Sequence, residues 1–92
     1  MPETRGEILA KRRDLSSQLG RRLADARVRA RLSQTDVAAS LGLAQSALAK
    51  MEAGQRLLPF LEALDLARLY GVEPSELDPR IETEDSAPER PT

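Results

Sequence analysis

Apolar residues recur every three or four positions through the first third of the chain, a spacing that predicts an amphipathic helix. We expect this helix to cover residues 7–31. Two starts fit the sequence: Ser16 or Ser17 acts as an N-cap, or the helix runs back to Ile8 without a break. A glycine inside it, Gly20, costs roughly 1 kcal/mol relative to alanine. The predicted apolar stripe consists of Leu15, Leu19, Leu23, Ala26 and Ala30.

Two short helices with strong boundary signals follow. Ser33 is a suitable N-cap for the first, and Gly42 suits the left-handed conformation that ends a helix. Asp36 stands where a capping box has Glu or Gln. The second short helix is expected over residues 45–53, with Gly54 ending it. The residues predicted to face inward are Val37, Ala38 and Leu41, then Leu48, Met51 and Glu52.

A fourth helix should begin near Pro59, which suits a first helical turn, and end at Gly71. A final short turn is expected over residues 74–77. Leu57 and Leu58 make the preceding loop apolar, and they fit either the core or a dimer surface. The predicted fold is therefore all-α and compact, with five helices and no strand. The buried face predicted for the fourth helix consists of Phe60, Ala63, Leu64, Ala67 and Tyr70.

The chain divides into an N-terminal extension (1–14), which is helical if the first helix runs back to Ile8, one domain (15–77) and a tail (78–92). The tail contains three prolines and five acids, so it should be disordered. Charge is distributed unevenly: residues 1–31 carry nine Lys/Arg against four Asp/Glu, and residues 73–92 carry two against seven. This asymmetry suggests a polyanion-binding body, although two solvated surfaces explain it equally well. The basic cluster at 11–13 is either a solvated face or a segment that follows DNA.

The composition argues against catalysis. The chain has no cysteine and no histidine, which excludes disulfides and thiolate sites and removes the commonest general base and metal ligand. We therefore predict no catalytic residues, no metal site and no cofactor. No apolar run approaches the length of a membrane span, and there is no signal-peptide core, so we expect a cytoplasmic protein without a membrane partner.

Four segments carry a recognisable motif. They read L-G-x-R-L-x-x-A-R at 19–27, L-S-Q-x-x-V-A at 32–38, L-G-L-x-Q-S-x-L-x-K-M-E-x-G at 41–54 and L-x-L-A-x-x-Y-G-V at 64–72. Together they resemble the Xre/Cro-repressor family of helix-turn-helix DNA-binding domains. The resemblance implies a repressor-like domain whose third helix lies in the major groove of DNA while the second crosses the backbone.

In that arrangement, the start of the third helix would read bases. The amide of Gln45 can make a bidentate contact with adenine N6 and N7, worth about 1–3 kcal/mol of discrimination. Ser46 can contact a base edge or a phosphate, and Lys50, about one turn further, can reach guanine or a phosphate. Ala44 and Ala47 are small enough to touch a thymine methyl or to allow close approach.

Phosphate contacts are predicted at the start of the second helix and after the third. Gln34 and Thr35 lie at a helix N-terminus, where free N–H groups and the helix dipole attract phosphate. Gln55 and Arg56 follow Gly54 in the next loop.

The acid Glu52 must point away from DNA, because phosphates would repel it. The resemblance implies that it pairs with Arg27 of the first helix as a structural ion pair.

The leading hypothesis is a sequence-specific transcriptional regulator, a repressor, that binds an inverted-repeat operator in double-stranded DNA as a homodimer. An alternative is an antitoxin or adaptor that binds a protein partner through the acidic tail and uses the helix-turn-helix for autoregulation. A third is a purely structural use of the fold without DNA binding. The residues do not distinguish repression from activation.

Overall fold

The computed structural model describes residues 2–81, and within that range it contains five helices and no strand. The predicted all-α fold is thereby confirmed. None of these helices is both long and apolar enough to pass through a membrane. The helices are α1 (Arg5–Arg29), α2 (Gln34–Leu41), α3 (Gln45–Glu52), α4 (Phe60–Tyr70) and α5 (Pro74–Leu77).

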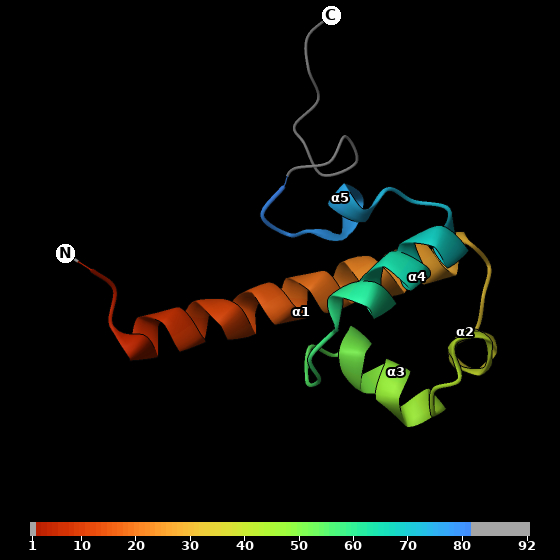
Figure 1. The fold of residues 1–92 in the computed structure, drawn as a ribbon, viewed down its shortest axis with the longest axis horizontal. Coiled ribbons are helices and arrows are strands. Elements are labelled where there is room, and N and C mark those ends of the chain that lie inside the picture. Colours follow the sequence, from red (N-terminus) through yellow and green to blue (C-terminus); the bar gives the residue numbers. More distant parts are fainter. Residues whose placement is uncertain (1, 82–92) are drawn as a thin grey trace, which may run out of the picture.

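The long helix α1 organises the molecule (Figure 1). Helices α2 and α3 lie on one side of it, α5 lies on the other, and α4 packs along its C-terminal half. The N-terminal part of α1 extends beyond all the other helices. The packed part of the molecule is therefore built around the second half of α1.

Helix α1 is continuous through the predicted N-terminal extension. Of the two starts that the sequence allowed, the run without a break at Ser16 or Ser17 is the one observed. The helix begins even earlier than Ile8, because Thr4 acts as its N-cap: the hydroxyl Oγ1 accepts a hydrogen bond from the backbone N–H of Glu7 at 3.1 Å. Residues 1–14 are thus not separated from the domain by a helix boundary.

The caps predicted for α2 are confirmed. Ser33 Oγ accepts a hydrogen bond from the backbone N–H of Asp36 at 3.0 Å, and Gly42 ends the helix with φ of 68°. Gly54 and Gly71 also adopt positive φ, at 74° and 70°. Gly42 is the one that lies between α2 and α3, and its left-handed conformation allows the chain to reverse there, so that these two helices pack against each other.

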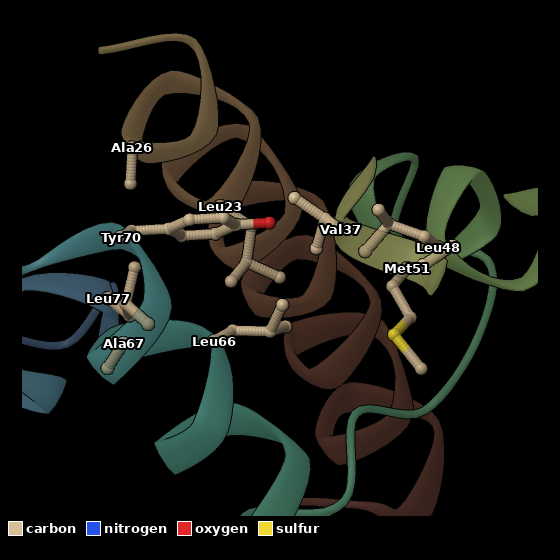
Figure 2. Packing of buried hydrophobic residues seen from close by; sticks show 10 residues of the cluster. Leu23, Ala26, Val37, Leu48, Met51, Leu66, Ala67, Tyr70 and Leu77 are labelled. Atoms are coloured by element: carbon tan, nitrogen blue, oxygen red, sulfur yellow. The ribbon is translucent and has the colours of Figure 1, made fainter. Parts of the chain in front are cut away.

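The core collects one or more aliphatic side chains from each helix (Figure 2). Leu23, Leu48 and Leu66 are fully buried, and Val37 is 1% exposed. Full burial of such a side chain contributes roughly 1.5–3 kcal/mol, so these residues hold α1 to α4 together. Tyr70 belongs to the same cluster and is labelled with it in Figure 2.

Two predictions about buried positions are wrong. Phe60, expected in the core, is 74% exposed, whereas Leu66, outside the predicted buried face, is fully buried. Phe60 shares the face of α4 that carries Ala63 and Ala67, but it stands at the first turn, beyond the edge of the core. Ala47, a candidate base contact from the sequence, is buried on the inner side of α3, with 8% exposure.

Close approach of α3 to α1 depends on two glycines. A Cβ at Gly20 would overlap the backbone carbonyl of Glu52, and one at Gly54 would lie 2.8 Å from the Cα of Ser17. The C-terminal end of α3 therefore rests directly on the backbone of α1. Gly20, which costs helix stability, is needed for this contact.

The expected tail boundary at Asp78 differs from the structure. Residues 78–81 lie against α1, because the Arg22 guanidinium donates hydrogen bonds to the carbonyls of Glu76, Asp78 and Ile81 at 3.2, 2.8 and 2.9 Å. No sequence pattern indicates these contacts, because their acceptors are backbone groups. The predicted disorder of residues 82–92 concerns positions outside the described residues.

Candidate nucleic-acid interface

Helix α3 presents one polar face to the outside. Ala44, Gln45, Ser46 and Lys50 are all exposed, while Leu48 and Met51 turn into the core. The helical period of 3.6 residues separates the two faces. Ala47 belongs to the inner face, so the small exposed residue available for a thymine methyl is Ala44.

The N-terminus of α3 carries no side-chain cap. Ala44 occupies the N-cap position and its methyl side chain cannot accept a hydrogen bond, in contrast to the hydroxyl of Ser33 at the start of α2. An uncapped helix N-terminus leaves N–H donors and the positive end of the helix dipole available to an anion. Gln45 and Ser46 stand in this first turn.

A chain of hydrogen bonds joins the N-terminus of α3 to its C-terminus through α2. Gln45 Nε2 donates to Gln34 Oε1 at 3.0 Å, and Gln34 Nε2 donates to Glu52 Oε1 at 2.9 Å. Gln34 is half-buried, whereas Gln45 is exposed. The two glutamines that the sequence singled out are therefore direct neighbours.

Arg27 completes this network from α1. Its Nε donates to Glu52 Oε2 at 2.7 Å and its Nη2 to Glu52 Oε1 at 3.2 Å, a bidentate ion pair. Its Nη1 donates to the Leu32 carbonyl at 2.9 Å. The hydrogen bond with Glu52 raises the pKa of Arg27, although desolvation opposes this. One guanidinium thus connects α1, the loop before α2 and the end of α3.

The Glu52 carboxylate sets the direction of both glutamine hydrogen bonds in the network. A carboxylate only accepts, so Gln34 must turn its amide nitrogen toward Glu52 and its oxygen toward Gln45. Gln45 must then donate to that oxygen. The Gln45 amide is left with its own Oε1 and a second N–H, an acceptor and a donor side by side, which is the pattern that matches adenine.

The residues assigned to phosphate contact lie at the surface around this network. Thr35, Gln55 and Arg56 are exposed, while Gln34 retains a second N–H beyond the one given to Glu52. The Gln55 backbone N–H donates to the Lys50 carbonyl at 2.8 Å, which holds the loop against the end of α3.

The sequence did not predict either glutamine hydrogen bond. Gln34 and Gln45 are 11 residues apart, and their contact depends on the angle between α2 and α3. Tyr70 was also missed as a neighbour of the ion pair: burial and the Glu52 charge raise the pKa of its phenol to about 12. Across residues 2–81, no cluster of acidic side chains forms that could hold a metal ion.

Comparisons with known proteins agree with this geometry. A family described as "Helix-turn-helix domain" matches residues 18–79. The restriction-modification controller protein C.AhdI from Aeromonas hydrophila is 38% identical in a solved structure, with a TM-score of 0.63, and the match covers 70% of this chain and 96% of that one. The DNA-binding domain of BldD is 28% identical, with a TM-score of 0.64 and coverage of 72% and 96%. No curated protein sequence matches.

Proposed function

Because the chain belongs to the Xre/Cro-like helix-turn-helix family of DNA-binding regulators, we propose that it is a sequence-specific repressor that binds an inverted-repeat operator as a homodimer. Helix α3 enters the major groove and α2 crosses the sugar-phosphate backbone. A regulator seated on its operator blocks access by other proteins.

One observation carries this proposal: the exposed amide of Gln45, held by Gln34 at the uncapped end of α3. An amide fixed in this way needs less ordering on binding than a free side chain, so more of its hydrogen-bond energy contributes to discrimination. Gln45 reads adenine, Ser46 and Lys50 contact neighbouring bases or phosphates, and Ala44 permits close approach.

The phosphate contacts position the base-contacting residues of α3 on the DNA. Gln34 offers its remaining N–H to a phosphate, Thr35 offers a hydroxyl, and Gln55 and Arg56 hold the backbone beyond the other end of α3. Such contacts fix register and carry no sequence information directly. Arg27 and Glu52 take no part in DNA binding. They hold the helices at the angle that base contact by α3 requires.

We propose a homodimer because the DNA-reading helix α3 is short. A single helix of eight residues contacts few base pairs, and two half-sites one helical turn apart multiply the specificity. Among the similar structures, that of BldD is a DNA-binding domain and C.AhdI is a controller protein; both support a regulatory role here.

Selection of binding sites from random duplex DNA tests the proposal. The wild-type chain should enrich an inverted repeat with an adenine in each half-site, and Gln45→Ala should lose preference at that position. Gln55→Ala should weaken binding to all sequences alike, because it removes a phosphate contact. Gln18→Ala serves as a control, since this glutamine lies on α1 and donates to Asp14. Wild-type protein that enriches no sequence, while remaining folded, would refute the proposal.

A further inference from the structure

The N-terminal part of α1 extends as an arm beyond the other helices. An apolar groove lies on the same face of α1 as the apolar edge of this arm. We define the arm as residues 5–14, all of which are exposed. The groove, of about 520 Å³, lies where the arm leaves the domain. It is formed by α1, the loop before α4, the start of α4 and the segment from Pro74 to Arg80.

The helical register places the apolar edge of the arm in line with the groove. Arg12, Leu15 and Leu19 line the groove, and Ile8 stands one turn before Arg12 on the same face. Ile8 and its neighbour Leu9 are 40% and 41% exposed. The stripe that fills the core in the second half of α1 therefore continues outward, where nothing in residues 2–81 covers it.

The outer wall of the groove is unusually apolar for a protein surface. Leu57 is 87% exposed, Phe60 is 74% exposed and the adjacent Leu61 is 72% exposed. Leu57 and Phe60 both line the groove. Contiguous exposed apolar side chains of this size mark an interaction site.

The arm and the region that borders the groove also differ in charge. Residues 5–14 carry four basic and two acidic side chains, whereas residues 59–81, which include α4 and α5, carry five acidic and two basic ones. The charged residues that line the groove itself are Arg12, Asp78 and Arg80. The arm of one molecule is thus attracted to the acidic region that borders the groove of another. The family match begins at residue 18, so the arm lies outside the matched region.

We infer that the N-terminal arm of one protomer lies in the apolar groove of its partner, and that this reciprocal exchange forms the homodimer. A single chain contains both halves of the contact, which is the condition for a two-fold interface. The inference rests on the proposed function, because it names the interface of the dimer proposed there. It also gives the exposed apolar edge of the arm a surface to pack against, and tertiary packing of an apolar face provides most of the stability of helices in proteins.

The absence of cysteine in the chain allows a direct test by cross-linking. Single variants Ile8→Cys and Leu57→Cys, one carrying a mass tag, are mixed and mildly oxidised. In the control experiment, Val28→Cys takes the place of Ile8→Cys. Val28 is also apolar and is 62% exposed, but it lies at the other end of α1. We expect the 8–57 product between chains to form at least tenfold faster than the 28–57 product. Equal rates, or products joining only identical positions, would overturn the inference.

Sedimentation of the full chain provides a second measurement without cysteines or DNA. Wild type and Val28→Asp should be dimers, while Ile8→Asp and Phe60→Asp should each be monomers that retain helical circular dichroism. If the dimer survives Ile8→Asp but not Phe60→Asp, the interface lies on α4 without the arm, and the inference is overturned. A monomeric wild type would overturn it as well. Site selection with the same variants separates the two proposals: a monomer that still prefers the half-site leaves the proposed DNA recognition intact.

Discussion

Replacing Arg27 by methionine should leave an uncompensated charge against the core. The Glu52 side chain is 7% exposed, and without Arg27 it keeps one hydrogen bond, from Gln34, in place of three. The Leu32 carbonyl loses its side-chain donor as well. Breaking a buried ion pair costs about 3–5 kcal/mol, and because the Arg27 side chain is 15% exposed we expect the lower end, about 3 kcal/mol.

The double variant Arg27→Met, Glu52→Leu removes both charges and should be more stable than Arg27→Met alone. Gln34 is half-buried, so its freed amide can turn to water. We expect the double variant to lose about 1 kcal/mol relative to wild type, which corresponds to a coupling energy of at least about 2 kcal/mol between the two residues.

Urea unfolding followed by circular dichroism measures these free energies in the wild type, both single variants and the double variant. A structural role for this ion pair is excluded if Arg27→Met costs less than about 1 kcal/mol, or if the double variant loses as much as the two single variants together.

Three further predictions concern other parts of the fold. Gly54→Ala should cost about 2 kcal/mol more than Gly71→Ala in urea unfolding, because both residues have positive φ but only a Cβ at Gly54 meets the backbone of α1; equal costs would exclude the close contact. Tyr70→Phe should preserve or raise stability at pH 7, since the hydroxyl finds no hydrogen-bond partner within residues 2–81. Because the folded pKa of Tyr70 is raised to about 12, wild-type stability should be complete below about pH 10 and fall as the pH rises to about 12, with a smaller fall in Tyr70→Phe; identical alkaline curves would contradict this. Hydrogen bonds from Arg80 lower the pKa of Asp78 to about 2, so the stability it contributes should be present above about pH 4 and fade toward pH 2; Arg80→Ala should flatten this acid limb, and an unchanged limb would refute the assignment.

The sequence predicted the order and type of the helices because their boundary residues act locally. Ser33, Gly42 and Gly71 each fix a helix end through their own backbone or side chain, so no tertiary information was needed. The apolar period also located most of the core. It misplaced Phe60 because periodicity tells which face a residue shares, and not where along the helix the neighbouring helices stop.

The finer structure of the candidate interface depends on tertiary geometry. The hydrogen bonds from Gln45 to Gln34 and from Gln34 to Glu52 join residues on different helices, and no local pattern encodes the angle between those helices. The role of Gly20 was equally invisible, since only the position of the Glu52 carbonyl reveals why a side chain is excluded there. Thr4 could have been recognised as an N-cap, because Glu7 follows it three residues later in the pattern of a capping box.

The proposed function depends most on base reading by Gln45. It is tested most directly by measuring Kd for the wild type and Gln45→Ala, each with the selected operator and with an operator in which the adenine read by Gln45 is replaced by guanine. We expect the wild type to lose about 5- to 150-fold in affinity on this replacement. Gln45→Ala should bind both operators with affinities that agree within about twofold. If Gln45→Ala keeps the wild-type preference for adenine, Gln45 does not read that base and the proposed role of Gln45 is wrong.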